Sequence, residues 1–401
     1  MTGLDAARIV GVCTTQQARS LLPRTGFSVA LEALTGALAD AGLTVGDLDG
    51  ICSDISGWPP GSPQLSADIY WSRQLGRPLR WPMRWPGAGV GIASMLAAAS
   101  AIGSGLASTV ALVSAGVREP HPGAVAPWAR PADEFTDWTG SYTAVQYALA
   151  AQRYLHEHGE TALEAMALTS ATIRNYGSIN PGAVYYHRGP YTAADVLASR
   201  PVASPFTMLM CSSVNDGGCA VVLTSADRAR DCARSGIRVL AGAAQWPYPS
   251  YAEAPVLDAV PDAGRFASDA LARGGVRHCD IDVVELYDHF AIGVLMQFEL
   301  YGFCGPGEAA DFVRSGVMGL DGRYPTCTDG GCQSFSHNGN PVLYQLAEAV
   351  RQLRGEVADD CAGPHDHRPG HCRAVRAPQI ALAANPGPPT CGGTFAVLAR
   401  D

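Results

Sequence analysis

Short apolar runs alternate with amphipathic stretches along most of the chain. The run at residues 7–12 is typical of a first buried strand, and residues 109–114 predict another. The longest apolar stretch, residues 87–117, is repeatedly interrupted by glycine and serine. Because a membrane span needs about 20 mostly apolar residues, this stretch predicts a buried Ala-rich helix that leads into the strand at residues 109–114. We expect no association with a membrane.

Two segments that lie 233 residues apart follow the same pattern. Residues 37–51 read ALADAGLTVGDLDGI, and residues 270–284 read ALARGGVRHCDIDVV. Each combines the end of an amphipathic helix, a glycine stop, a polar Asp-x-Asp turn and an apolar strand. The spacing is too long for a solenoid repeat. It predicts two similar α/β halves, residues 1–240 and 241–401, with helices on both faces of the sheet. Residues 118–202 fit neither period and predict an insertion of loops and helices.

Composition and charge exclude several classes of function. Hydrophobic residues make up 47% and charged residues 16% of the 401 residues, which predicts a large core and no disordered segment. The net charge of −9 argues against a nucleic-acid partner, whereas a local cleft for an anion such as coenzyme A is compatible with it. The first 14 residues lack a signal-peptide pattern. We therefore expect a cytoplasmic protein whose twelve cysteines are reduced.

Three segments occur in an order that resembles the thiolase superfamily. Residues 214–225 read VNDGGCAVVLTS, residues 280–316 include DIDVVELYDHF, and residues 327–355 include CTDGGCQSFSHNGNPVLYQ. The resemblance extends over nearly the whole chain and indicates the branch around sterol-carrier-protein-type thiolases and actinobacterial lipid-transfer proteins. It implies a five-layer α-β-α-β-α fold built from two similar halves, at least a dimer, and a CoA thioester that enters from the insertion.

The cysteine nucleophile of thiolases is missing from this chain. The family places it at the start of the Ala-rich helix, where Ala88 is the matching position and is expected to contact the substrate. No cysteine occurs between Cys52 and Cys211, so no shift of the alignment supplies one. Ser94 lies inside the helix without a nearby base and is not expected to replace it. Without a thiolate no acyl-enzyme forms by the usual route, which excludes ordinary thiolysis.

The sequence Tyr287-Asp288-His289-Phe290 follows a strand predicted at residues 281–286. It stands at the place of the family's Asn-Glu-Ala-Phe or His-Asp-Cys-Phe motif. The resemblance implies that Tyr287 is catalytic and that Asp288 and His289 contact the substrate. Acyl-CoA retro-aldolases of steroid side-chain degradation in this branch also carry a tyrosine here. A phenol has an ordinary pKa near 10 and is normally a donor, so it acts as a base only when it is activated.

The sequence Ser336-His337-Asn338-Gly339 matches the thiolase Gly-His-Pro motif and precedes a helix predicted from residue 341. A positive helix N-terminus favours an enolate or thioester oxyanion nearby and keeps a histidine neutral. The resemblance implies that His337 is catalytic and that Asn338 contacts the substrate, although the retro-aldolases have a second tyrosine at the position of His337. Tyr344, on the same helix, is expected to pack.

Two segments near the carboxyl terminus add further cysteines to the candidates. Cys391 and Gly392 stand where thiolases have Cys-x-Gly, and we expect them to line the substrate pocket. The segment from Cys361 to Cys372 also contains three histidines, but its spacing matches no common zinc pattern. We expect a solvated loop there. The prediction is therefore no metal and no bound cofactor, with coenzyme A present only as part of the substrate.

These residues and the resemblance together predict an enzyme that acts on a carbon–carbon bond of an acyl-CoA, in particular a retro-aldol (or aldol) lyase on a β-hydroxyacyl-CoA. Tyr287 is expected to be the general base or its proton relay, and His337 to stabilise the enolate. Relatives of this kind work with a small OB-fold and zinc-ribbon protein, which implies a hetero-oligomer. Two alternatives stay open: a Claisen-type acyltransferase of secondary metabolism, and a non-catalytic thiolase-like scaffold subunit.

Overall fold

The computed structural model describes residues 3–56, 67–83, 91–118, 143–248, 253–260, 262–338, 342–362, 372–386 and 392–401. Within them, nine strands form one continuous sheet in the order β3-β2-β4-β7-β1-β8-β11-β10-β9. The strands are β1 Ala7–Thr14, β2 Gly50–Ser56, β3 Trp81–Met83, β4 Thr109–Gly116, β7 Gly217–Ser225, β8 Ile237–Gln245, β9 Val283–Glu285, β10 Ile380–Pro386 and β11 Gly393–Arg400. A separate hairpin pairs β5 Pro201–Ala203 with β6 Phe206–Thr207.

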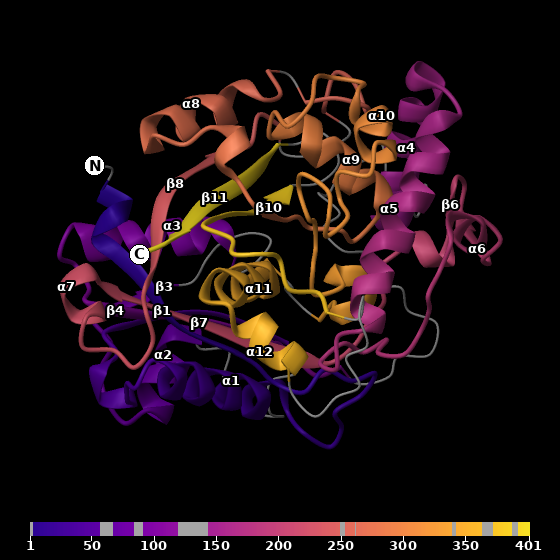
Figure 1. The fold of residues 1–401 in the computed structure, drawn as a ribbon. Helices are drawn as coiled ribbons and strands as arrows, with labels where there is room; N and C mark the ends of the chain where they lie inside the picture. The colour runs from indigo at the N-terminus through magenta and orange to yellow at the C-terminus, as the bar shows by residue number, and fades with distance from the viewer. Residues whose placement is uncertain are drawn as a thin grey trace.

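The sheet folds in two around central helices (Figure 1). A short pairing between β1 and β8 joins its two wings. Between the wings lie α3 Ile92–Gly103 and α11 Val342–Arg354, which share one core with the inner faces of both wings. On the outside, α1 Gly26–Asp40 and α2 Ala67–Gln74 cover the first wing, and α8 Arg265–Gly274 and α9 Ala291–Leu300 cover the second. The predicted five-layer α-β-α-β-α fold is confirmed.

Alternation of side chains along β7 explains why the wings are buried on both faces. Cys219, Val221 and Leu223 belong to the central core, whereas Ala220 and Val222 belong to the outer core under α1. Successive side chains of a strand point to opposite faces. A strand that is covered on both sides therefore appears in the sequence as an uninterrupted apolar run.

The internal repeat has the same local structure at both places. Each segment ends a helix, α1 or α8, with a glycine in the left-handed conformation, Gly42 or Gly275, both with φ of 70°. A 3₁₀ turn follows, η2 Val45–Asp47 or η5 His278–Asp280, and then a strand, β2 or β9. The predicted order of helix, glycine stop, turn and strand is confirmed in both. The boundary between halves near residue 240 stays a prediction.

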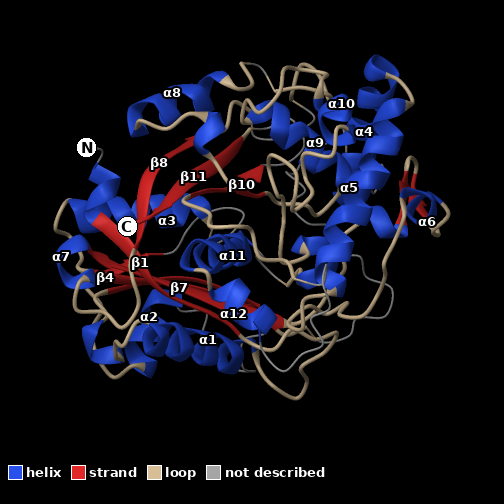
Figure 2. Ribbon diagram, in the orientation of Figure 1, coloured by secondary structure: helices blue, strands red, loops and turns tan. Residues whose placement is uncertain are grey.

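The described part of the insertion, residues 143–202, is mainly helical (Figure 2). It contains α4 Thr143–His158, α5 Thr161–Ser178 and α6 Ala193–Leu197. The first two pack against α9, and α5 also packs against α10 Ala309–Arg314. The insertion therefore lies beside the segment that follows β9. The remaining short helices are η1 Gly3–Ala6, η4 Met208–Met210, α7 Ala226–Ala229, the π-helix η6 Gly331–Phe335 and α12 Glu356–Ala362.

The local predictions agree with the structure except in their limits. The first strand is β1, the Ala-rich helix is α3, and the strand that follows it is β4. The strand predicted at residues 281–286 is shorter, since β9 covers only Val283–Glu285. None of the helices in the described ranges is long and apolar enough to cross a membrane.

Candidate active site

Tyr287 lies just beyond β9, and a single buried side chain holds its backbone. The Tyr287 N–H donates to Oε1 of Gln297 at 3.2 Å, and Nε2 of Gln297 donates to the Tyr287 carbonyl at 2.8 Å. The same nitrogen donates to the Gly293 carbonyl at 2.7 Å within α9. These bonds fix the amide of Gln297, so α9 determines the backbone position from which the phenol extends.

His337 lies between η6, a π-helix at Gly331–Phe335, and α11. Its N–H donates to Oδ1 of Asn215 at 2.6 Å. Its Nε2 lies 3.0 Å from the hydroxyl oxygen of Tyr287. The two side chains that the sequence selected as catalytic therefore share a hydrogen bond across 50 residues of chain.

Both members of this pair are neutral near pH 7. Burial raises the pKa of Tyr287 well above 10, and the charge of Arg118 opposes part of that rise. Burial, followed by the charge of Arg118, lowers the pKa of His337 to about 4. Burial and Arg118 therefore favour a neutral His337, and the expected contribution of the helix terminus stays a prediction. A neutral imidazole accepts a proton at Nε2 when Nδ1 carries the hydrogen.

Arg118 brings a positive charge to the pair and was missed in the sequence. It follows β4, and its N–H donates to Oδ1 of Asp216 at 3.1 Å. Burial lowers the pKa of Arg118, while Asp216 and Tyr287 raise it. A cation at this place suits an oxygen that gains negative charge during a reaction. The same signal that selected Tyr287, a polar residue directly after a buried strand, also marks Arg118.

His289 belongs to an aromatic wall beside the pair. Its ring centroid lies 4.3 Å from that of Tyr287 and 4.3 Å from that of Tyr147 on α4, and the ring of Phe290 lies 5.0 Å away. Burial, and then the charge of His337, lower the pKa of His289 to about 3. Its Nδ1 has no hydrogen-bond partner among the described residues. The insertion therefore contributes to the site, and substrate contact by His289 stays a prediction.

Asp288 anchors the neighbouring π-helix. Its Oδ1 accepts from the Cys332 N–H at 2.6 Å, and its Oδ2 accepts from the Gln333 N–H at 3.1 Å. Burial raises the pKa of Asp288 to about 6, and these backbone bonds oppose the rise. Because both carboxylate oxygens already bind the start of η6, these contacts give no support to the prediction that Asp288 contacts the substrate.

Asn338 is fully buried and donates through Nδ2 to the Tyr344 hydroxyl at 2.7 Å. That hydroxyl donates in turn to Oε1 of Gln17 at 2.8 Å. Tyr344 packs against Phe335, as expected, with ring centroids 5.3 Å apart. The expectation of packing alone was incomplete, because the phenol also joins a hydrogen-bond network from the first wing. Substrate contact by Asn338 stays a prediction.

Gly392 adopts a conformation that only glycine takes readily. Its φ is 107°, and a Cβ atom there would lie 2.0 Å from the carbonyl oxygen of Gln245 at the end of β8. The structure thus gives a packing reason for this glycine, and its predicted place in the substrate pocket is not tested. Ala88 and Cys391 lie outside the described residues.

No described group near the pair replaces the missing nucleophile. Ser94 is buried, and its hydroxyl donates to the Gly91 carbonyl at 2.8 Å and accepts from the Gly91 N–H at 2.9 Å, which caps α3. Cys327 and Cys332 are buried, and burial raises the pKa of each thiol well above its ordinary value. Both are therefore thiols at neutral pH, and the thiolate is the nucleophilic form.

The N-termini of the two central helices meet beside this region. A Cβ atom on Gly91, the N-cap of α3, would lie 2.9 Å from Cγ1 of Val342, the first residue of α11. Each helix N-terminus carries a partial positive charge. The two partial charges therefore lie close together between the wings.

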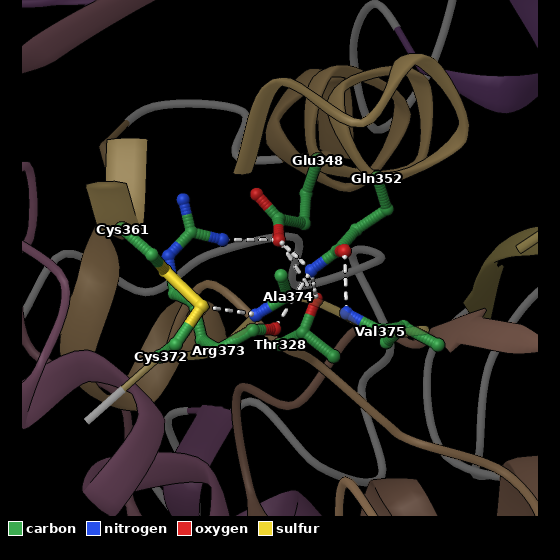
Figure 3. The surroundings of a disulfide bond; sticks show 8 residues. All are labelled: Thr328, Glu348, Gln352, Cys361, Cys372, Arg373, Ala374 and Val375. Carbon is green, nitrogen blue, oxygen red and sulfur yellow. Dashed lines mark hydrogen bonds and ion pairs between the residues drawn. A yellow bond between two sulfur atoms is a disulfide. The ribbon is translucent and has the colours of Figure 1, made fainter. Parts of the chain in front are cut away.

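A buried ionic network stands on α11 (Figure 3). Glu348, which is 1% exposed, pairs with Arg373 and accepts from the Thr328 hydroxyl at 2.7 Å and from Nε2 of Gln352 at 2.9 Å. Gln352 also donates to the Arg373 carbonyl at 3.0 Å. The network ties the segment after residue 371 to the central helix.

Cys361 and Cys372 form a disulfide at the edge of this network (Figure 3). The expectation that all twelve cysteines are reduced is wrong for this pair. The two Cα atoms lie 5.4 Å apart because α12 ends opposite the segment that leads to Arg373, which is within disulfide reach. The three histidines of this segment lie outside the described residues. Among the described residues, no group of three or more metal-ligating side chains could hold a metal ion.

Comparison with known proteins gives a consistent family. Residues 247–368 match the family model described as thiolase C-terminal domain-like. A 17-hydroxy-3-oxo-4-pregnene-20-carboxyl-CoA lyase of Mycobacterium tuberculosis is 37% identical over 56% of this chain and 58% of its own length. A steroid side-chain-cleaving aldolase of Thermomonospora curvata is 31% identical over 87% of this chain and 90% of its own length. The chain thus spans little more than half of the first relative and most of the second.

Solved structures agree with these relatives. An Ltp2-ChsH2(DUF35) aldolase is 27% identical, with a TM-score of 0.81 over 99% of this chain and 98% of that chain. Human mitochondrial 3-ketoacyl-CoA thiolase, at 17% identity and a TM-score of 0.65, shares the fold over 99% of this chain and 100% of its own. The chain belongs to the thiolase superfamily, in the branch that includes the steroid side-chain-cleaving aldolases.

Proposed function

We propose that the protein is a retro-aldol lyase that cleaves the Cα–Cβ bond of a β-hydroxyacyl-CoA. The β-hydroxyl loses its proton, the bond breaks to leave a carbonyl on Cβ, and the bonding electrons pass into the thioester as an enolate. Protonation of Cα then gives a shorter acyl-CoA. The observation that carries the proposal is the partly buried hydrogen bond of 3.0 Å between Tyr287 and His337, in a chain that lacks the thiolase nucleophile.

The proton path follows from the neutral state of both side chains. The Tyr287 hydroxyl accepts the proton of the substrate hydroxyl while it gives its own proton to Nε2 of His337. His337 then holds the proton beside the enolate and returns it through Tyr287 to Cα. Because the pKa of His337 is lowered to about 4, its imidazolium is a strong acid for this return step. Each cycle restores both side chains.

Positive groups around the pair support the enolate. Arg118 provides a full charge, and the N-termini of α3 and α11 meet at Gly91 and Val342. Donors that are in place before the reaction cost no reorganisation when charge develops, and one such donor is worth roughly 10²–10³ in turnover. Whereas we first expected His337 to stabilise the enolate, its hydrogen bond to Tyr287 supports a role as proton store.

The named substrate of the Mycobacterium tuberculosis relative provides a specific candidate. In 17-hydroxy-3-oxo-4-pregnene-20-carboxyl-CoA the C17 hydroxyl is β to the thioester. Cleavage between C17 and C20 would release a 17-ketone and propanoyl-CoA. The aromatic wall of Tyr147, His289 and Phe290 supports an apolar ring system of this kind. Coenzyme A enters as part of the substrate.

The assembly is part of the proposal. The name of the Ltp2-ChsH2(DUF35) aldolase gives two protein components. We extend this to the present chain as a homodimeric core with a small OB-fold and zinc-ribbon partner, working in the cytoplasm without nucleic acid or membrane. The partner would be needed for solubility or activity.

Product analysis tests the reaction. The chain, co-expressed with its partner, is incubated with 17-hydroxy-3-oxo-4-pregnene-20-carboxyl-CoA, and the products are separated by liquid chromatography and mass spectrometry. We expect the 17-ketone and propanoyl-CoA in equal amounts. Release of free coenzyme A without the ketone would replace the lyase with an acyl-transfer or hydrolytic reaction. A complex that turns over neither this thioester nor simpler β-hydroxyacyl-CoAs would be a scaffold, contrary to the proposal.

A further inference from the structure

Gln17 lies just after β1 in the first wing, and its side-chain amide has one fixed orientation. Its Nε2 donates to the Thr15 carbonyl at 2.6 Å and lies 3.4 Å from the Gly218 carbonyl at the start of β7. Carbonyl oxygens only accept, so the nitrogen must face them and Oε1 must face away. The residue is 9% exposed. The first wing therefore presents a buried acceptor in a defined direction.

Two hydroxyl groups, one just before α11 and one on it, donate to that acceptor. Ser336 Oγ and the Tyr344 hydroxyl each lie 2.8 Å from Oε1 of Gln17. Each also accepts from an amide nitrogen, Ser336 from Nδ2 of Asn215 at 2.9 Å and Tyr344 from Nδ2 of Asn338 at 2.7 Å. Because amide nitrogens only donate, both hydroxyl hydrogens must point to Gln17. The network has one consistent direction and converges on a single atom.

This network brackets His337. Ser336 precedes it and Asn338 follows it, so both neighbours are tied to the network. Asn215 adds a third restraint, since its Oδ1 accepts from the His337 N–H at 2.6 Å. These restraints act on the backbone, whereas Tyr287 contacts the ring at Nε2. The position of the His337 imidazole against the Tyr287 phenol therefore depends on Oε1 of Gln17, an acceptor from the first wing.

We infer that Gln17 is a positioning residue for His337, holding its loop so that Nε2 meets the Tyr287 hydroxyl. The inference deepens the proposed function and rests on it for its kinetic consequence. Leucine at this position would remove the acceptor on which both hydroxyl groups converge. Glutamate would keep an acceptor but would bury a carboxylate oxygen against two carbonyl oxygens, an unfavourable contact.

Gly217 provides a second way to disturb the same atom. A Cβ atom on Gly217 would lie 1.8 Å from Oε1 of Gln17. Gly217→Ala therefore displaces the Gln17 amide by steric contact while every polar group of the network is kept.

Thr224 offers the matched control: it lies seven residues further along β7, roughly 23 Å away at about 3.3 Å per residue. Thr224→Val removes a buried hydroxyl that is bonded to Thr109 and to the Ser108 carbonyl.

Two readouts separate positioning from simple loss of stability. In Gln17→Leu and Gly217→Ala we expect kcat on the steroid thioester to fall roughly 10–100-fold with KM within about twofold, because displacement of a reacting group by about 1 Å costs up to 10². Thr224→Val should leave kcat unchanged. The second readout needs no turnover: NMR of histidine-labelled protein, with the His337 signal assigned by its loss in His337→Asn, gives the titration of that imidazole.

The titration separates this inference from the proposed function. The charged or titratable groups that act on His337 are Tyr287, Arg118 and His289, and none of them is changed. We expect the pKa of His337 to rise from about 4 by at least one unit in both variants, because a loosened ring gains water. If both variants titrate like the wild type, or if the wild type turns over and both variants lose no more kcat than Thr224→Val, Gln17 does not position His337. If titration shifts but no variant or wild type cleaves any β-hydroxyacyl-CoA, the inference holds and the proposed reaction fails.

Discussion

Replacement of Tyr287 by phenylalanine removes one hydroxyl and leaves the ring. The ring contact with His289, at 4.3 Å between centroids, should survive, and so should the backbone bonds to Gln297. The loss is the hydrogen bond to Nε2 of His337. Leaving that partly buried nitrogen unpaired costs at most about 1–3 kcal/mol, which is less than the 5–15 kcal/mol typical of a folded protein. The variant should fold.

The kinetic effect should be much larger than this loss suggests. Proton transfer by a positioned group is worth roughly 10²–10⁴ in rate, or about 3–5 kcal/mol at 1.36 kcal/mol per tenfold change. With the phenol gone, Nε2 of His337 has no group through which to reach the substrate hydroxyl. We therefore expect turnover to fall at least 100-fold while KM stays within about threefold, because the aromatic wall of Tyr147, His289 and Phe290, which we propose contacts the substrate, is unchanged.

The assay is the initial rate of propanoyl-CoA release from the steroid thioester, with thermal unfolding measured on the same samples. Tyr176→Phe is the control, because its hydroxyl donates to the buried Met318 carbonyl at 2.7 Å and takes no part in the proposed reaction. The control should lose comparable stability and keep its turnover. If Tyr287→Phe turns over within threefold of the wild type, the proton does not pass through this phenol.

Three further predictions concern pH, the buried ion pair and the partner. Because the pKa of His337 is lowered to about 4, its neutral form persists in mild acid, and kcat should stay constant from pH 8 to 5.5. A histidine with the ordinary pKa of 6.5 would instead lose about tenfold in kcat over this range. Arg373→Met should cost roughly 3–5 kcal/mol in denaturant unfolding by leaving Glu348 unpaired, and addition of Glu348→Gln should recover most of it; equal loss in both would contradict the pairing. The chain alone should be poorly soluble or inactive, and a monodisperse, fully active homodimer on gel filtration would argue against a partner.

Patterns local in sequence predicted most of the fold. The repeat could be recognised in the sequence because each helix ends at a glycine in the left-handed conformation, followed by a polar turn. These glycines are Gly42 and Gly275, both with φ of 70°. The strands β4 and β7 could be recognised as uninterrupted apolar runs because both of their faces are covered. The limits of β9 were less accurate, since strand ends depend on pairing with partners such as β10, nearly 100 residues away.

The candidate site was predicted only in part, for the same reason. Tyr287 and His337 stand in motifs, so the sequence selected them, but their hydrogen bond is a product of the fold. Asn215 and Gln17 could not be selected, because 122 residues separate Asn215 from His337 and 319 separate Gln17 from Ser336. No local pattern links such residues. The disulfide was missed because an expected reducing compartment outweighed geometry that the sequence does not contain.

We propose that this thiolase-like site breaks a carbon–carbon bond without an acyl-enzyme. Intact-protein mass spectrometry during turnover of the steroid thioester tests it most directly, with acetyl-CoA as a second probe. We expect an unmodified chain mass with both thioesters while propanoyl-CoA accumulates from the first. A stoichiometric, hydroxylamine-labile acyl group on the chain would contradict it.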